Sequence, residues 1–462
     1  MEKSIKTLNL TMLNDGLNML NNAPTMLDAN PTVADDDPIF RLLMEYRQDT
    51  RDHKIDLGIG VYRDENNQSP VFAAVKAAEQ WRVDTETEKA YIGPLGDLAF
   101  CGAVTSLALG EPLAAKLSSR IAFAQTPGGV GALRLAFELL HNKKSDMTLW
   151  LSDTTWQVHR PIAETVGLNI KTYPYYVERD SLSCLSGASA ASVESEDLTS
   201  VGRRPIEHTL KKLSEAAVGD AILLQASCHN PTGLDFSPQE WDELVQLCLD
   251  KQLTPIIDMA YHGLGKGLDA ERYGLQLFAQ RVPQLVLCYT CSKNFGLYRD
   301  RVGMLLVLAQ DTHQQAIAEK QLMQLATRHY FTPPAHGASL VKKILQDKSL
   351  KAPWLAELEQ MRLRLITVRH AMVNGLASSE GAALRDWRFL TDGGGMFALF
   401  PLTAEEIKTL KQEEGIYIVD NGRVNLSGLN PSNIPSALAA IIKVIDQSLI
   451  NQLNSIGEQY VS

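Results

Sequence analysis

The stretch QLVLCYTCSKNFGLYRDRVG, residues 284–303, joins an apolar run to a lysine, Lys293, and to an arginine eight residues further on, Arg301. An apolar run closed by polar residues is typical of a strand buried on both faces of a parallel sheet. A lysine that follows a strand is most often simply exposed, because burial of its charge costs free energy. The position of Lys293 therefore raises the question of what an amine does at the end of a buried strand.

Four more apolar runs lie in the middle of the chain, and each ends in turn-forming or polar residues. They are TLWLSD (148–153), AILLQASCHNPTG (221–233), TPIIDMAYHG (254–263) and VGMLLVLAQ (302–310). Helical stretches separate several of them, such as SPQEWDELVQLCLDKQ (237–252), whose apolar residues recur at intervals of three and four. Strands that alternate with amphipathic helices predict an α/β domain with a mainly parallel sheet.

The pattern changes after about residue 345, where a long helical stretch (355–377) precedes short strand-like segments around GGMFALFP and GIYIVDNGRVNLSG. We expect a second, smaller α+β unit there. Residues 179–204 are rich in serine and poor in large apolar residues, which is typical of a surface insertion. Residues 1–33 are rich in Asn, Met and Leu and are interpreted as an N-terminal extension.

Composition limits the class of protein. The chain has 462 residues and a formal net charge of −10, so no basic surface for a nucleic acid is expected. We find no run of about 18 apolar residues for a membrane helix and no signal or transit peptide. Cys288 and Cys291 form a C-x-x-C pair, but strand neighbours alternate between faces and no second pair follows at zinc spacing. We expect a cytoplasmic protein with no metal site and no nucleic-acid or membrane partner.

Three unlike polar residues follow the apolar runs at the same end: Asn230, Asp258 and Lys293. Each has a simpler explanation by itself, namely a turn residue before proline, a helix cap and an exposed lysine. The carboxyl ends of parallel strands meet at one edge of the sheet, where ligands bind in open α/β folds. The three side chains are therefore predicted to converge on one site.

A glycine-rich turn, TPGGVGALRLAFELL (126–140), leads directly into a helix. Such a junction binds anions, typically phosphate, through exposed backbone N–H groups and the helix dipole. The glycines match neither the P-loop nor the dinucleotide-binding pattern. A lysine near a phosphate site suggests an amine that forms a Schiff base. Pyridoxal 5'-phosphate (PLP) uses all of these groups.

Seven motifs of this chain resemble those of the aspartate and aromatic amino-acid aminotransferases, the class I PLP-dependent enzymes of fold type I. They are LGIGVYRDE, TPGGVGALR, CHNPTG, DMAYHGLGKG, SKNFGLYRDRVG, PPAHGAS and GGMF with GRVNLSG, in the order of that family from about Asp37 to near the C-terminus. The resemblance implies a large PLP-binding domain over 70–358 with a mainly parallel seven-stranded sheet. It also implies a smaller α+β domain that combines 34–69 with 359–462.

The same resemblance implies a role for each catalytic residue. Lys293 would form the Schiff base with PLP and then shuttle the proton at the substrate α-carbon. Asp258 would keep the ring nitrogen protonated. Tyr261 and Asn230 would donate hydrogen bonds to the phenolic oxygen of PLP, and Trp156 would stack on its ring.

The resemblance also assigns the groups at the phosphate. Gly129 and Val130 would bind it through the glycine-rich turn, together with Thr290 and Arg301. Arginine suits phosphate because its planar guanidinium donates two hydrogen bonds at once. Tyr91 would reach the phosphate from a neighbouring subunit, which implies a homodimer with shared active sites.

Further residues are assigned to substrate and support. Arg423 would bind the α-carboxylate of an amino acid or 2-oxo acid, with Gly60 closing over it. Trp156 and Asn230 would also contact substrate. His159 would support Asp258 from behind.

Two positions depart from the family pattern. Val130 stands where a threonine is usual, so one hydroxyl to the phosphate is lost. In the dicarboxylate enzymes an arginine six residues before the Pro-Pro pair reaches the distal carboxylate of the substrate from the neighbouring subunit. In LATRHYFTPPAHG that position is Thr327, and Arg328 follows it. We therefore expect aromatic or uncharged side chains to be favoured, with aspartate as the alternative substrate.

Two other function classes compete with transamination. PLP-dependent lyases, decarboxylases and racemases occur on the same fold, but retention of Tyr261, Arg301 and Arg423 favours transamination. A binding module that has kept only the fold would have lost Lys293 or its partners, and all of them are present.

Overall fold

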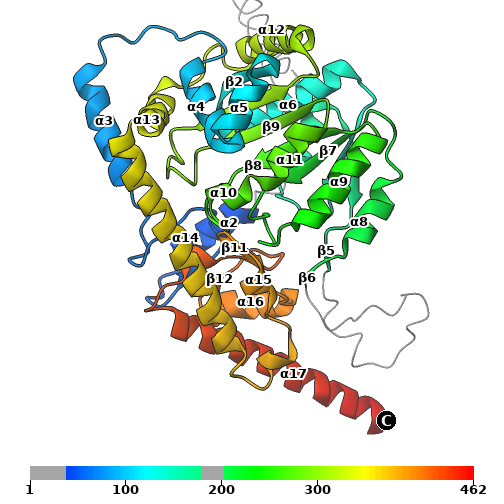
Figure 1. Ribbon diagram of the computed structural model, residues 1–462. Coiled ribbons are helices and arrows are strands. Elements are labelled where there is room, and N and C mark those ends of the chain that lie inside the picture. The colour runs from blue at the N-terminus through cyan, green and yellow to red at the C-terminus, as the bar shows by residue number, and fades with distance from the viewer. Residues whose placement is uncertain (1–37, 178–201, 462) are drawn as a thin grey trace, which may run out of the picture.

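The computed structural model describes residues 38–177 and 202–461 (Figure 1). The predicted extension, residues 1–33, and most of the predicted insertion lie outside the described residues. Gly202 and Arg203, which the sequence interpretation placed in the insertion, form strand β6 (Gly202–Arg203) and pair antiparallel with β5 (Tyr176–Val177).

The central sheet has seven strands in the order β2-β10-β9-β8-β7-β3-β4. Its strands are β2 (Ile121–Pro127), β3 (Thr148–Ser152), β4 (Asn169–Tyr173), β7 (Ala221–Gln225), β8 (Thr254–Met259), β9 (Leu285–Thr290) and β10 (Val302–Leu308). Strand β10 runs antiparallel to both of its neighbours, whereas β9, β8, β7, β3 and β4 are mutually parallel. The prediction of an α/β fold with a mainly parallel sheet is confirmed.

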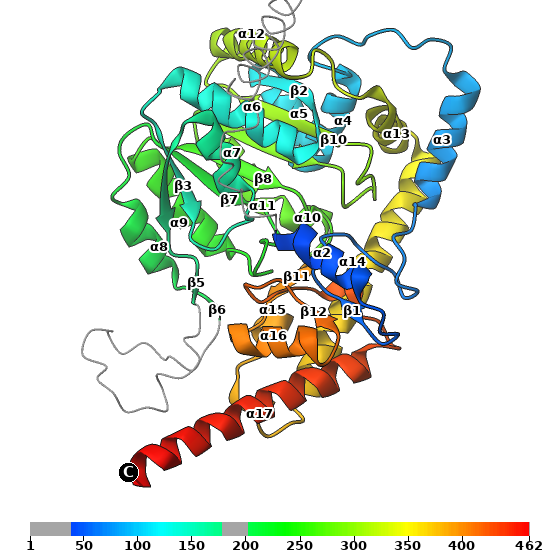
Figure 2. The same ribbon diagram turned by 180° about the vertical axis from the view of Figure 1, so that it is seen from behind.

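Helices cover both faces of this sheet (Figures 1 and 2). On one face lie α6 (Gly128–Lys143), α7 (His159–Val166) and α12 (Thr312–His329). On the other lie α4 (Leu98–Leu109), α9 (Pro238–Asp250), α11 (Tyr273–Arg281) and α13 (Ala335–Gln346). In β9, Leu285 and Leu287 pack into one layer while Val286 and Cys288 pack into the other. Burial on both faces explains the continuous apolar runs.

The C-x-x-C pair divides between these two layers. Cys288 belongs to the cluster that contains α6, and Cys291 to the cluster on the opposite face. Both cysteines are buried and neither forms a disulfide. Burial raises the pKa of both thiols, which keeps them neutral.

The smaller part of the molecule joins the two ends of the described chain. Strand β1 (Ile55–Asp56) pairs with β12 (Ile416–Tyr417), and β11 (Phe397–Leu399) pairs with β13 (Arg423–Asn425). The long helix α14 (Lys348–Leu376) runs from α3 (Ala73–Thr85) and α13 toward α17 (Ile434–Val461) (Figures 1 and 2). The domain limits at residues 69 and 358 stay a prediction.

The remaining elements connect these layers. They are α2 (Pro38–Gln48), α5 (Glu111–Leu117), α8 (Ile206–Leu213), α10 (Leu268–Glu271), α15 (Phe389–Asp392) and α16 (Ala404–Gln412), with the 3-10 helices η1 (Ser118–Arg120), η2 (Ala382–Leu384) and η3 (Leu426–Gly428).

Helix α17 contains a segment, Ile434–Asn451, that is long and apolar enough to cross a membrane by length and composition alone. Its mean hydropathy is 1.2. The segment includes Lys443, which forms an ion pair with Glu414 at 2.6 Å, and the helix packs against α14 and α16. A core helix of a soluble protein passes the same test, so the segment is weak support for a membrane span.

A close approach between β10 and the start of α6 generates the first prediction. A Cβ atom on Gly303 would lie 2.5 Å from the carbonyl carbon of Gly128. We expect Gly303→Ala to lower the free energy of unfolding by ~1–3 kcal/mol, the usual cost of overpacking. The urea midpoint measures this effect.

Gly202→Ala is the matched control, because a Cβ on this strand glycine meets no atom within 4 Å. Its midpoint should stay close to that of the unchanged protein. Equal midpoints for Gly303→Ala and Gly202→Ala would show that the contact at Gly128 does not constrain the fold.

Candidate active site

The site lies where the parallel strands β7, β8 and β9 end. Gln225 and Asp258 are neighbours in the register of β7 and β8, and Lys293 follows β9 by three residues. A cavity of about 180 Å³ opens at this edge. Its lining residues are Gly60, Gly129, Val130, Leu133, Trp156, Gln225, Asn230, Asp258, Ala260, Tyr261, Thr290, Ser292, Lys293, Tyr298 and Arg301. The structure therefore brings most of the predicted site residues together.

Lys293 points its amine over the ring of Tyr261, with Nζ 4.8 Å from the ring centroid. Burial lowers the pKa of Lys293 to about 8, the Asp258 carboxylate opposes this change, and the Arg301 guanidinium adds to it. An ordinary lysine has a pKa near ~10.4 and is almost wholly charged at neutral pH. Lys293 is thus a nucleophilic amine within the physiological pH range.

Asp258 is held from behind by His159. The His159 Nε2 atom lies 3.1 Å from the Asp258 carboxylate, and Nδ1 lies 2.8 Å from the Thr155 hydroxyl. A carboxylate only accepts hydrogen bonds, so Nε2 donates to it, and in the neutral imidazole Nδ1 accepts from Thr155. Trp156, which lines the cavity, packs edge-to-face on the His159 ring at 5.3 Å. This arrangement fixes the carboxylate toward the cavity.

Asn230 and Tyr261 form the third wall. The Asn230 Nδ2 group donates to the Tyr261 hydroxyl at 3.2 Å. Among the described residues, the buried Oδ1 atom of Asn230 has no hydrogen-bond partner. Burial raises the pKa of Tyr261, and the Arg423 charge acts in the opposite direction. The tyrosine therefore keeps its proton as a donor, and the Asn230 amide oxygen is left as an acceptor.

Positive charge gathers at the opposite end of the cavity. Gly128 opens α6 with φ +71°, and a Cβ there would lie 2.5 Å from Nη2 of Arg301. Only glycine lets the guanidinium approach the N-terminus of this 16-residue helix. The N-terminal end of the helix dipole and the guanidinium are both positive, so their proximity favours an anion between them. The Thr290 and Ser292 hydroxyls, 3.0 Å apart, lie beside them.

Arg423 lies next to the cavity but is not one of its lining residues. Its Nη2 group donates to the Gly58 carbonyl at 2.6 Å, and its guanidinium stacks on the Phe397 ring at 4.7 Å. Phe397 in turn packs edge-to-face on Tyr261 at 5.6 Å. Phe397 thus holds Arg423 near Tyr261, next to the part of the cavity that Gly60 lines.

Besides Arg423, three predicted site residues do not line the cavity of their own chain, and these three are exposed on its surface. Tyr91 is 83 % exposed and packs edge-to-face on Phe331 at 5.5 Å. Thr327 and Arg328 are exposed in the last turn of α12, and the Thr327 hydroxyl donates to the Met323 carbonyl at 2.7 Å. The structure therefore does not bring these three residues to the site within one chain.

Sequence reasoning missed several residues of the site. Gln225, Ser292 and Tyr298 line the cavity, and Thr155 contacts His159. Gln225 had a signal in the sequence, because it ends an apolar run at the same edge as Asp258. Thr155 had none, since its role depends on the position of a histidine ring in space.

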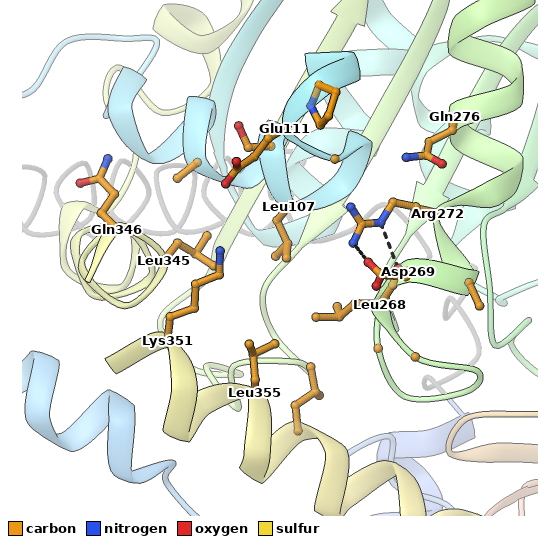
Figure 3. A pocket seen from close by; sticks show the side chains of 18 of the residues that line it. Leu107, Glu111, Leu268, Asp269, Arg272, Gln276, Leu345, Gln346, Lys351 and Leu355 are labelled. Carbon is orange, nitrogen blue, oxygen red and sulfur yellow. Dashed lines mark hydrogen bonds and ion pairs between the residues drawn. The ribbon is translucent and has the colours of Figure 1, made fainter. Parts of the chain in front are cut away.

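A larger cavity of about 1450 Å³ lies elsewhere, between α4, α10 and α14 (Figure 3). Leu107, Leu268 and Leu355 contribute apolar surface, and Arg272 forms an ion pair with Asp269 at its edge. None of the predicted site residues lines it. Size alone thus does not identify the active site, whereas the amine, the carboxylate and the anion site do.

The donor set fits PLP. The nucleophilic amine of Lys293 suits its aldehyde, Asp258 suits its ring nitrogen, and the turn at Gly128 with Arg301 suits its phosphate. The Tyr261 hydroxyl and the second N–H of the Asn230 Nδ2 group are the donors that suit its phenolic oxygen. Fold and site together define a PLP-dependent enzyme of fold type I.

Comparison with known proteins gives the family. The family model "Aminotransferase class I and II" matches residues 52–441. The chain is 39% identical to an aromatic-amino-acid aminotransferase of Pseudomonas aeruginosa over 88% of its length and 96% of that relative. It is 37% identical to the aspartate aminotransferase of Escherichia coli K12, over 88% of this chain and 98% of that one.

Solved structures agree with this result. The aromatic-amino-acid aminotransferase of Burkholderia pseudomallei, covalently bound to pyridoxal phosphate, superposes with a TM-score of 0.82 at 31% identity. The superposition covers 91% of this chain and 100% of that one. The protein belongs to the class I and II aminotransferases and is a PLP-dependent transaminase.

The charge environment of Lys293 predicts a pH dependence. In the cofactor-free protein, labelling of Lys293 by a small neutral acylating reagent should rise with a midpoint near pH 8. Asp258→Asn removes the charge that raises this pKa, so its midpoint should fall. Arg301→Gln removes the charge that lowers it, so its midpoint should rise. Peptide mass spectrometry measures the labelled fraction at each pH.

The two variants serve as controls for each other, because their shifts have opposite signs. A midpoint above ~10 in the unchanged protein, as for an exposed lysine, would refute the assignment. Shifts of the same sign in both variants would also contradict it.

Proposed function

We propose that this aminotransferase prefers amino acids with aromatic or uncharged side chains as donors and passes their amino group to a 2-oxo acid. The observation that carries the proposal is Thr327, six residues before Pro333, where the dicarboxylate enzymes have an arginine. A threonine offers no charge to a distal carboxylate, and its hydroxyl is already bonded to its own helix. Relatives with aromatic-amino-acid and tyrosine in their names support this preference.

When bound, PLP supplies an aldehyde that condenses with amines and a ring that takes up the electron pair released at the α-carbon. Lys293 moves the proton at that α-carbon, since its amine is neutral over part of the physiological range. The Asp258 carboxylate, oriented by His159, would hold a proton on the ring nitrogen. Asp258 and His159 are both buried, which excludes water from the Asp258 carboxylate.

The remaining residues orient the substrate. Arg423 would bind the α-carboxylate, and stacking on Phe397 holds its guanidinium in place. Tyr261 and Asn230, whose side chains are joined by an Nδ2 to hydroxyl hydrogen bond of 3.2 Å, would donate to the phenolic oxygen. These contacts and the anion site at Arg301 would hold both the substrate and the cofactor in place. Such positioning lowers the entropic part of the activation free energy.

We also propose that the enzyme is a homodimer with shared active sites. Tyr91 and Phe331 form an exposed aromatic pair, which a monomer has no need to keep in water. Phe331 also has φ +61°, a strained conformation for a bulky residue. Thr327 and Arg328 lie close to Phe331 along the chain. This surface is proposed to complete the neighbouring site.

A cytoplasmic location without membrane or nucleic-acid partners is part of the same proposal. The negative net charge supports the absence of a nucleic-acid partner, because it would repel the phosphate backbone. The alternative substrate is aspartate, which would require Arg328 to act in place of Thr327. The aspartate aminotransferases among the relatives favour keeping this alternative.

Substitution at position 327 tests the substrate preference. Thr327→Arg should raise kcat/KM for aspartate roughly 10- to 100-fold, the value of a hydrogen bond to a charged group, and leave phenylalanine nearly unchanged. Single-turnover half-reactions with phenylalanine, tyrosine, aspartate and glutamate measure both effects.

Arg328→Thr is the matched control on the neighbouring position. It should change aspartate conversion little if Arg328 points elsewhere. A large loss of aspartate conversion in Arg328→Thr, with fast aspartate turnover in the unchanged enzyme, would support the dicarboxylate alternative instead.

Subunit complementation tests the shared site. Lys293→Ala and Tyr91→Ala are each expected to lower activity, but in a mixed dimer one site combines an intact Lys293 with an intact Tyr91. After unfolding and refolding together, the mixture should approach about a quarter of the wild-type rate.

Mixing Lys293→Ala with Arg301→Ala gives the control, because both residues belong to the same chain's cavity. No mixed dimer then contains an intact site, and no recovery is expected. Equal recovery in both mixtures would rule out the proposed exchange of Tyr91.

A further inference from the structure

Gln225 ends strand β7 and is buried beside Asp258, its register partner on β8. Its amide forms two hydrogen bonds with the backbone of a single residue, Asn230. The Nε2 group donates to the Asn230 carbonyl at 2.9 Å, and the Oε1 atom accepts from the Asn230 N–H at 2.8 Å. Two bonds to the N–H and C=O of one residue fix both its position and its rotation.

The side chain of Asn230 transmits this restraint to the site. Its Nδ2 group donates to the Tyr261 hydroxyl at 3.2 Å, and the Tyr261 ring lies 4.8 Å from the Lys293 amine. Gln225 also lines the cavity, but its hydrogen bonds are directed at the backbone. Its side chain is thus placed to orient another residue.

Other contacts hold the surrounding loop. Asp235 accepts from the backbone N–H groups of Cys228 and His229, and the Gly233 N–H donates to the His229 carbonyl. The Ser227 hydroxyl donates to Glu271. The loop that contains Asn230 therefore has anchors on both sides that are independent of Gln225.

We propose that Gln225 is a positioning residue that aims the Asn230 amide and the Tyr261 hydroxyl together at the phenolic oxygen of PLP. The inference rests on the proposed roles of Asn230 and Tyr261. A neutral amide is required, because a carboxylate at this position could not donate to the Asn230 carbonyl and would place a second negative charge beside Asp258.

The test is a pH titration of the visible absorbance of bound PLP in the holoenzyme. Weaker donation to the phenolic oxygen raises the pKa of the group conjugated with it. Charged or titratable groups that face this region are Asp258 on β8, His159 on α7, Tyr261, Lys293, Tyr298, Arg301 and Arg423 on β13. Gln225→Met leaves all of them in place and adds no charge, so its shift reports the altered restraint.

We expect Gln225→Met, which keeps the size of the side chain and removes both hydrogen bonds, to move the transition upward by roughly half to one pH unit. Gln225→Glu should move it further, because it also adds negative charge. Asn230→Ala should shift the transition upward as well. The double variant Gln225→Met with Asn230→Ala should match Asn230→Ala alone, since Gln225 acts through Asn230.

Additive shifts in the double variant would overturn the inference, because Gln225 would then act directly. A lower unfolding temperature in Gln225→Met without a shift in the titration would assign it a structural role only. No shift in Asn230→Ala would show that the proposed role of Asn230 is wrong, and the inference with it. A shift in Asn230→Ala without one in either Gln225 variant would overturn the inference alone.

Discussion

The amine of Lys293 is influenced by one negative and one positive group that line the same cavity, and the rest of the site depends on this arrangement. Burial removes the amine from water, Arg301 makes its charged form less favourable, and Asp258 limits how far the pKa falls. The parallel strands β8 and β9 bring Asp258 and Lys293 to one edge, and Arg301 directly precedes the antiparallel strand β10. The sheet order therefore sets the chemistry before any loop is considered.

The close approach of the β10 backbone to the start of α6 sets the position of the Arg301 guanidinium. Gly303 in β10 lies against Gly128, and Gly128 in turn leaves room for the Arg301 guanidinium at the start of α6. Arg301 itself has φ +54°, so the turn after β9 is held in a conformation that its own residue does not favour. Packing in the sheet thus determines where an anion can bind, and the distance between the anion site and Lys293 follows from it.

Much of this could be predicted from the sequence, and the rest could not for physical reasons. Asn230, Asp258 and Lys293 follow apolar runs, and parallel strands bring such positions together in any α/β sheet. Gln225 and Thr155 were missed because their partners are a backbone segment and a histidine ring, whose positions no local pattern records. Gly202 and Arg203 were placed in the insertion because composition cannot detect a two-residue ladder.

Tyr91, Thr327 and Arg328 show a different limit of prediction from the sequence. They lie on the surface of their own chain, so motif order could name them but a single chain could not place them at a site. The groups that make the chemistry possible come from one sheet, whereas the groups proposed to select the substrate side chain come from the end of α12. The side-chain preference can therefore change by substitution on α12 while the environment of Lys293 stays the same. Under this proposal, relatives with the same fold could differ in side-chain preference, as the names aromatic-amino-acid and aspartate aminotransferase among them suggest.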